Sequence, residues 1–462
     1  MLLLVIGATA GGSASAETLS DALVKAYLNH PNLASARAGL RIADEQVVQE
    51  RAVGLGAVNG TASLGLTSTQ GSIQATGSGR QNSDPVSLGL TGAIPIYSGG
   101  QVRYAVAGAQ EGVRATRAGL MSAEQDVLLA AITAYEDVRR DISFVSLARN
   151  NVRVISEQVR AARDRFEVGE VTRTDVSQAE ARLAASRSNL AASVGALSQS
   201  RQAYLAAVGD LPQDLSSPPP IPPLPESEDA ALALALAEHP DLVQARYTAR
   251  RAEYDVKRAV GAGLPQLELR GNLSYSNTGA TLNGGESNTA AVSLNATVPL
   301  WTGGAQPSAV RQAQASLAQR TSQVHELARI IGQRTSVSWS SLEVARSTIS
   351  ARREQIRAAQ VAFDGVKEEA TLGARTTLDV LDAEQELVSA RAELVSSKRD
   401  EYVAAYALLG AVGKLTVIHL GLDVPGYDPE AYMTEALRTP YGWVDDDSAK
   451  LEGAWSLFNG RP

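Results

Sequence analysis

The sequence predicts an α+β membrane protein in which two tandem repeats each supply two transmembrane-length strands and a pair of long coiled-coil helices. Three observations predict this fold class: an internal repeat along most of the 462 residues, four stretches of alternating polarity, and proline-free stretches with a seven-residue apolar period. Aromatic residues make up only 5% of the chain, which favours helices packed through small side chains over one globular core. The net charge of −8, with no basic stripe, argues against nucleic-acid binding.

The N-terminal segment has the pattern of a secretory leader. Residues 2–6 are all apolar, and Ala14-Ser15-Ala16 form an A-x-A cleavage site. We therefore expect a signal peptide over residues 1–16 and an exported chain that begins at Glu17; a short core segment is the alternative. Because the sequence has no cysteine, it has neither a disulfide framework nor a lipid-anchor cysteine.

The internal repeat divides the chain into two halves. Three segments recur at nearly constant offsets: His30-Pro31 as His239-Pro240 after 209 positions, Pro95–Gly100 as Pro299–Gly304 after 204, and Thr172–Leu183 as Thr376–Leu387 after 204. The expected domains are a first repeat over 17–210, a proline-rich connector over 211–228, a second repeat over 229–412 and a C-terminal tail over 413–462. We interpret the connector as an extended linker, with a docking ligand as the alternative, and the tail as a loosely held appendage.

Each repeat is expected to begin with a helix and then contain two strands, at about 57–69 and 85–97 in the first repeat and about 264–277 and 289–301 in the second. Apolar and polar residues alternate there, as in Leu88-Gly89-Leu90-Thr91, and each stretch has the length of a tilted transmembrane strand. A glycine- and polar-rich loop, such as Gln70 to Asp84, joins each pair. The polar face is rich in Ser, Thr and Asn, and Tyr97 and Trp301 stand at equivalent strand ends, where aromatic residues favour a membrane interface. Strands of a soluble sheet are the alternative.

Four strands are too few to close a sheet in lipid. An open edge is not tolerated there, and membrane barrels have at least about eight strands. Several copies must therefore complete the wall. Two copies would give 8 strands and a barrel filled by side chains, whereas three would give 12 strands and the open lumen that a duct needs.

Long helices are expected at about 99–166, 173–208, 305–370 and 376–412. About 65 residues of continuous helix extend roughly 100 Å. Apolar seams recur every seven residues, which predicts left-handed supercoiling; they include Val138, Val145, Val152 and Val159, then Val176, Leu183, Leu190 and Leu197, and Leu381, Val388, Val395 and Tyr402.

Together these elements resemble the TolC family of outer-membrane efflux proteins, most sharply in Val168-Gly169, Thr174-Asp175-Val176 and Leu372–Ala383. The resemblance implies a homotrimer in the outer membrane of a Gram-negative bacterium, in contact with outer-membrane lipid. A 12-stranded transmembrane β-barrel would continue into a coiled-coil α-helical barrel in the periplasm. It also implies a passive exit duct for type I protein secretion or multidrug efflux. Such a duct would dock to a periplasmic adaptor (membrane fusion) protein and, through it, to an inner-membrane pump of the ABC or RND type.

The resemblance also assigns the functional residues. Asp379 and Asp382 would form acidic rings in a periplasmic aperture, while Arg375, Thr174 and Asp175 would tie neighbouring helices together. The helix tips that contact the adaptor would be Val168-Gly169-Glu170 and Leu372-Gly373-Ala374. The family often has an aromatic residue in the closing network where this chain has Ala370, so the lock is expected to differ here.

No catalytic residue, metal site or cofactor is predicted. The four histidines, His30, His239, His325 and His419, lack metal-ligand spacing, and Gly410–Leu415 lacks the first glycine and the Ser/Thr of a phosphate loop. The alternative function is a trimeric coiled-coil structural or surface protein with a β-barrel anchor and no transport role. A duct would conduct ions in a bilayer, and a stalk would not.

Overall fold

The structure is a computed structural model that describes residues 16–73, 77–277 and 285–438. Apart from Ala16, the expected signal peptide lies outside the described residues. The chain forms two compact units. Unit 1 consists of residues 1–37, 119–242 and 326–426, and unit 2 of residues 38–118, 243–325 and 427–462.

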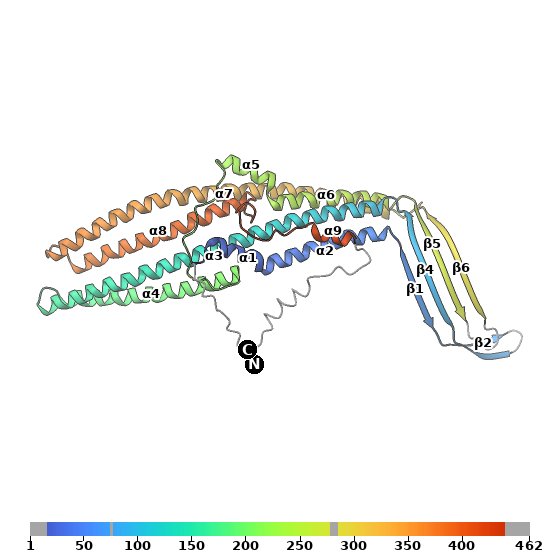
Figure 1. The fold of residues 1–462 in the computed structure, drawn as a ribbon, viewed down its shortest axis with the longest axis horizontal. Coiled ribbons are helices and arrows are strands. Elements are labelled where there is room, and N and C mark those ends of the chain that lie inside the picture. Colours follow the sequence, from blue (N-terminus) through green and yellow to red (C-terminus); the bar gives the residue numbers. More distant parts are fainter. Residues whose placement is uncertain (1–15, 74–76, 278–284, 439–462) are drawn as a thin grey trace, which may run out of the picture. The chain divides into compact units, whose positions relative to one another are not determined.

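The two repeats contain the same elements in the same order (Figure 1). The first repeat has α1 (Leu19–Asn29), α2 (Pro31–Val53), β1 (Ala57–Leu64), β4 (Val86–Tyr97), α3 (Gln101–Glu167) and α4 (Arg173–Val208). The second has α5 (Glu228–Glu238), α6 (Pro240–Gly261), β5 (Gln266–Asn277), β6 (Glu286–Thr297), α7 (Ala305–Thr371) and α8 (Thr377–Ala411). No helix within the described ranges combines the length and the apolar character that crossing a membrane requires.

The first helix of each repeat ends at a His-Pro pair. Proline has no N–H and disfavours helical backbone in the residue before it, so the helix stops and a new one starts. His30 and His239 are the two C-cap residues, with extended ψ angles of 126°. Each imidazole Nδ1 accepts a hydrogen bond from the backbone N–H two residues on, at 3.2 Å, so these histidines serve the helix joints.

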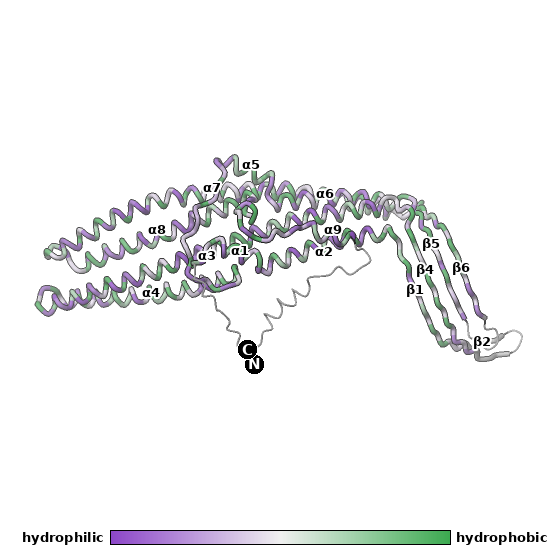
Figure 2. The backbone as a smooth tube through the Cα atoms, viewed as in Figure 1, coloured by the Kyte–Doolittle hydropathy of each residue, from purple (hydrophilic) through white to green (hydrophobic). Residues whose placement is uncertain are grey.

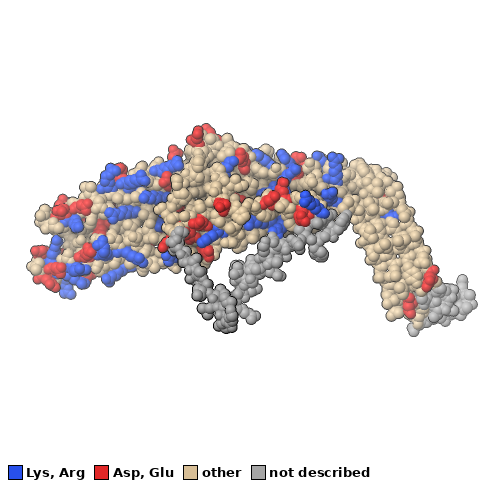
Figure 3. Space-filling view, viewed as in Figure 1, with Lys and Arg blue, Asp and Glu red and all other residues tan. Residues whose placement is uncertain are grey.

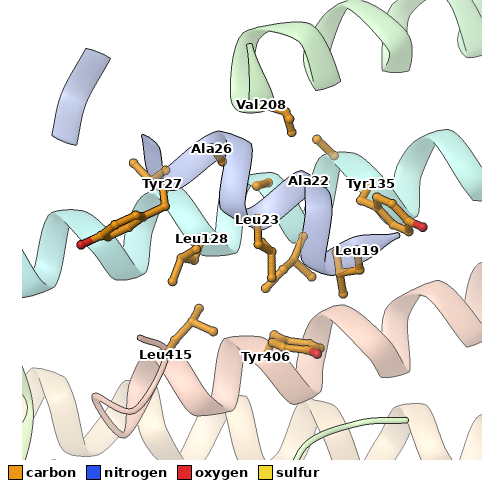
Figure 4. Packing of buried hydrophobic residues seen from close by; sticks show 14 of the residues in the cluster. Leu19, Ala22, Leu23, Ala26, Tyr27, Leu128, Tyr135, Val208, Tyr406 and Leu415 are labelled. Atoms are coloured by element: carbon orange, nitrogen blue, oxygen red, sulfur yellow. The ribbon is translucent and has the colours of Figure 1, made fainter. Parts of the chain in front are cut away.

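The main apolar core of unit 1 is built from both repeats. Side chains of α1, α3, α4 and α8 converge in it together with the segment that follows α8 (Figure 4). Its fully buried members include Leu19, Leu128, Tyr135, Tyr204 and Leu415. Burial of apolar surface from distant parts of the sequence therefore joins the two repeats.

The proline-rich connector packs on this core. The backbone of Glu17 forms a parallel bridge with Leu215, and Ile221 and Leu224 are partly buried against the apolar cluster. The hydroxyl of Tyr135 donates to the carbonyl oxygens of Glu17, at 3.0 Å, and Ser216, at 2.9 Å. The connector is therefore a fixed strap within its own chain.

The interpretation of the tail as a loosely held appendage is wrong for its first residues. Leu415 and Val417 are buried in the main core, and the N–H of Val417 donates to Oε1 of Glu124 at 2.7 Å. These two apolar residues are easily overlooked in a segment rich in glycine and proline. In unit 2, α9 (Ala431–Arg438) contacts α2 through the hydroxyl of Tyr432, which donates to Glu45 at 2.9 Å. Residues 439–462 lie outside the described ranges.

Unit 2 contains an antiparallel sheet with the strand order β1-β4-β5-β6. Its registers, such as Leu90 opposite both Gly60 and Leu273, place the aliphatic residues of all four strands on one face. The opposite face carries mainly Ser, Thr, Asn, Gly and Ala, with the ion pair Glu268–Arg270. The alternation along each strand is visible in Figure 2. Both faces are largely exposed, because no helix in the described part of unit 2 covers them.

The segment expected to be a loop between the first two strands contains a hairpin. Strands β2 (Thr67–Ile73) and β3 (Gly77–Ser83) pair with each other, with Thr67 opposite Ser83. Polar residues fill most of both strands, so no apolar period marked them in the sequence. The matching loop of the second repeat, residues 278–284, lies outside the described residues.

Candidate functional site at the helical tips

The turn between α3 and α4, which we call the first tip, consists of residues 168–172. Its glycine, Gly169, has φ +81°, a backbone conformation that side chains with a Cβ rarely adopt. The N–H of Gly169 donates to the carbonyl of Phe166 at 3.0 Å, and that of Glu170 donates to the carbonyl of Arg165 at 2.9 Å. These two bonds satisfy two of the last carbonyls of α3, and the glycine ends the helix.

The second tip, residues 372–376 between α7 and α8, repeats this geometry. Gly373 has φ +78°, its N–H donates to Ala370 at 3.3 Å, and the N–H of Ala374 donates to Glu369 at 2.9 Å. The flanking residues Val168 and Leu372 are 71% and 83% exposed. Each tip therefore presents an exposed aliphatic side chain on a tightly bonded turn.

Capping boxes begin the helices that leave the tips. The Oδ2 atom of Asp379 accepts hydrogen bonds from the backbone N–H and the hydroxyl of Thr376, both at 2.9 Å. Asp175 does the same with Thr172, at 2.9 and 2.8 Å. The backbone hydrogen bond from the capping threonine, followed by the hydroxyl bond, lowers the pKa of both aspartates. Both carboxylates are therefore bound at the start of their own helices.

Arg375, which was expected to tie neighbouring helices together, pairs within its own tip. Its Nε lies 2.9 Å from Oε2 of Glu369, and this carboxylate raises the pKa of the guanidinium. Thr174 is exposed on the first turn of α4. Within one chain, then, Arg375, Asp175 and Asp379 make local contacts.

Asp382 is different because its partner belongs to the other repeat. Its Oδ1 lies 2.5 Å from Nη2 of Arg182 on α4, so this pair joins α4 to α8. The apolar cluster beside it contains Ala179 of α4 and Leu381 of α8, together with Ile155, Val159 and Ala162 of α3. Sequence reasoning did not single out Arg182, because its partner lies 200 positions away.

The two tips border one hollow of about 520 Å³. Its lining comes from both turns and includes Arg165, Glu170, Asp175, Ala370, Leu372 and Arg375. Figure 1 shows the ends of the α3–α4 and α7–α8 hairpins side by side. Among the described residues, no three acidic or histidine side chains are placed to hold a metal ion.

Glu384 is a second residue that sequence reasoning missed. It is only 4% exposed, and its Oε2 has no hydrogen-bond partner among the described residues. Burial raises its pKa to about 7. Its counterpart 204 positions earlier, Glu180, is exposed and pairs with Arg163. The repeat offset identifies Glu180 and Glu384 as equivalent positions. Only the packing shows that one is exposed and the other buried.

The two aromatic residues expected at a membrane interface lie in unit 2. Tyr97 is the last residue of β4, whereas Trp301 follows β6 by four residues. The pairing of β6 stops at Thr297 because its partner strand begins at Gln266, directly after Pro265. Tyr97 is 45% and Trp301 88% exposed. Figure 3 shows few charged side chains on the visible face of the sheet and many over the helices.

Comparisons with known proteins place this chain among outer-membrane channels. The family model described as outer membrane efflux protein matches residues 22–210 and 231–414. Outer membrane efflux protein BepC of Brucella suis is 38% identical over 439 residues, covering 94% of each chain. Outer membrane protein TolC of Escherichia coli is 27% identical over 449 residues, covering 90% of this chain and 86% of that protein. The crystal structure of VceC from Vibrio cholerae, 22% identical, has the same fold with a TM-score of 0.72 over 86% of this chain and 96% of that one.

Proposed function

Because the chain belongs to the outer membrane efflux protein family, we propose that three copies form an exit duct through the outer membrane and into the periplasm. The membership confirms the resemblance to TolC. The protein is an outer-membrane channel of the efflux and secretion class. The trimer, the closed 12-stranded barrel and the partners belong to the proposal.

The proposal that several copies close a barrel rests on the sheet of unit 2. Its aliphatic face is exposed, with Leu64, Leu90 and Leu294 at 78%, 47% and 62%, and its other face is mainly polar. Strands β1 and β6 are its edges. In lipid, the unpaired backbone groups of two edges would cost several kcal/mol each, so a second copy must pair with them. The alternative, a coiled-coil stalk with a small β-barrel anchor, would also have to pair its strand edges in lipid. It would not need the polar inner face that this sheet has.

The helical tips support the rest of the proposal. Their exposed turns, Val168-Gly169-Glu170 and Leu372-Gly373-Ala374, would meet a periplasmic adaptor protein, and the adaptor would connect the duct to an inner-membrane ABC or RND-type pump. Asp379 and Asp382, brought together by three-fold symmetry, would line the aperture with Arg375, Thr174 and Asp175 around it. Tyr97 and Trp301 would stand at the membrane interface. Comparing the secreted proteins and the drug sensitivity of a deletion strain would separate type I secretion from multidrug efflux.

A cysteine cross-link tests closure by neighbouring copies. The register of β1 with β4, Ala57 opposite Ala93, recurs 209 and 204 positions later as Gln266 opposite Thr297. By the same offsets, the pair Leu90–Leu273 of β4 and β5 predicts Leu294 of β6 opposite Leu64 of the next copy.

We therefore expect L64C/L294C to form disulfide-linked dimers and trimers on a denaturing gel, in a background without other cysteines. V58C/L294C is the matched control and should stay monomeric, because its positions are six residues out of register. Monomers alone from both variants, together with no ion conductance in planar bilayers, would contradict the proposal.

A further inference from the structure

One ion pair near the tips joins the two helical hairpins of the chain, α3–α4 and α7–α8. It is the pair between Arg182 and Asp382, half-exposed at 44% and 55%. We propose that Arg182 is a positioning residue that holds the α7–α8 hairpin against the α3–α4 hairpin and so keeps the tip end of the duct closed. This inference rests on the proposed function.

Several other charged groups near the tips are bound inside a single hairpin. Arg375 pairs with Glu369, and Asp379 binds its own capping threonine. Arg163 pairs with Glu180 inside the α3–α4 hairpin. Across the described parts of these four helices, two ion pairs cross between the hairpins: Arg182–Asp382 near the tips and Arg399–Asp137 (2.9 Å) far from them. Arg182 is therefore the cationic contact between the hairpins at the end where an aperture would lie.

Apolar packing next to the pair holds its two backbones in place. Ala179 and Leu381 are buried in one cluster, and Leu183 packs against it. Arg182 and Asp382 directly adjoin Leu183 and Leu381 in the sequence. Since α4 and α8 are already in contact there, forming the ion pair orders only two side chains. Separating the hairpins would break this packing and the ion pair together.

Loss of the ion pair should shift the equilibrium between the closed and open tip end only slightly in one chain, but strongly in the trimer. An exposed ion pair changes an equilibrium by a factor of up to about five. Three symmetric pairs that open together would multiply this to about a hundredfold. The pair also offsets the charge of Asp382, so removing Arg182 would expose three extra negative charges to permeating ions.

Planar-bilayer recordings on the purified full-length trimer test this inference. R182A and D382N should both raise the conductance several-fold, because each removes the tether. Their ion selectivities should shift in opposite directions, with R182A more cation-selective and D382N less so. The double variant should conduct like the single variants, and the charge-swapped R182D/D382R should return towards the wild-type conductance.

Two control variants make the result specific. R163A removes an ion pair of similar exposure that lies inside one hairpin, and it should conduct like the wild type. R182K keeps the charge and should remain mostly closed. Size-exclusion chromatography of every variant checks that it is an intact trimer.

The inference is overturned if R182A conducts like R163A, or if R182A and D382N change the conductance in opposite directions, as charge alone would do. Either result leaves the duct itself intact. A wild-type trimer and variants that all fail to conduct would refute the proposed function as well.

Discussion

Glu384 and Glu180 occupy equivalent positions in the two repeats but have different surroundings. Glu180 is exposed beside Arg163, whereas Glu384 is buried, and the residue equivalent to Arg163 is Lys367, which acts on it only at longer range. The charged groups around Glu384 are Arg153 and Glu157 on α3, Lys367 on α7 and Arg391 on α8. Burial outweighs the three cations, so the neutral acid is favoured below about pH 7.

This difference predicts a pH-dependent stability. The folded pKa of Glu384, about 7, lies above the ordinary value of 4.5, so the stabilisation is complete below pH 4.5 and is lost as the pH rises to about 7. The full loss is of the order of 3 kcal/mol. We expect the melting temperature of Glu384→Gln in detergent to fall less between pH 5 and pH 8 than that of the wild type, and to exceed it at pH 8. Part of the fall should remain, because burial also raises the pKa of other acids, such as Asp44 to about 6. Glu180→Gln is the control and should keep the wild-type pH dependence. Equal pH profiles for the wild type and Glu384→Gln would rule out this role.

At the scale of elements, the junctions between strands and long helices are the most constrained places. Gly99 follows β4 with φ +61°, and a Cβ there would lie 2.3 Å from the carbonyl oxygen of Gly261. Gly303, its repeat counterpart after β6, also has φ +61°, but a Cβ would meet nothing within 4 Å in the single chain. The space that Gly261 fills beside β4 is thus open beside the edge strand β6.

We expect alanine at these two glycines to act at different stages. Gly99→Ala should prevent folding of the chain, because the clash adds to a backbone cost of about 1–2 kcal/mol. Gly303→Ala should fold but assemble poorly, since a neighbouring copy that pairs with β6 would need this space. Folding yield and trimer yield, from circular dichroism and size-exclusion chromatography, separate the two effects. Normal trimers from Gly303→Ala would show that no neighbour packs closely there.

At the scale of the whole molecule, the main core joins sequence segments that lie far apart. Tyr135 binds Glu17 and the connector, and the hydroxyl of Tyr402 donates to the carbonyl of Pro219 at 2.8 Å. Two tyrosines from different repeats therefore hold the strap between the repeats. Both tyrosine side chains are buried, and their hydroxyls reach the more exposed backbone of the strap.

Removing both hydroxyls should release the connector while leaving the apolar rings in the core. We expect the free energy of unfolding of Tyr135→Phe/Tyr402→Phe to fall by about 1–3 kcal/mol, because each substitution removes a hydroxyl that donates to the backbone of the strap. Limited proteolysis should then cut within residues 211–225 at a clearly higher rate than in the wild type. Tyr104→Phe, at a tyrosine outside this core, serves as the control. Unchanged cleavage in the double variant would mean that the apolar contacts of Ile221 and Leu224 alone hold the strap.

Local patterns in the sequence located the long helices to within two residues and the four sheet strands to within five. The largest error is in the first strand, which was expected to reach residue 69 but ends at Leu64. The signals used were apolar periods of two and seven residues and the His-Pro and Val-Gly pairs. They reflect local backbone preferences, which do not depend on distant contacts. The polar hairpin of β2 and β3 carries no apolar period and was expected to be a loop. The burial of Leu415 was also missed, because it depends on helices from the rest of the chain.

The sequence by itself determined the repeat plan, the two-faced strands, the tip turns and the family. Only the tertiary structure decided that Asp382 meets Arg182, that Glu384 is buried while Glu180 is exposed, and that the connector is a strap. The physical reason is that backbone preferences act over a few residues, whereas burial and ion pairing depend on which distant segments share the same small volume.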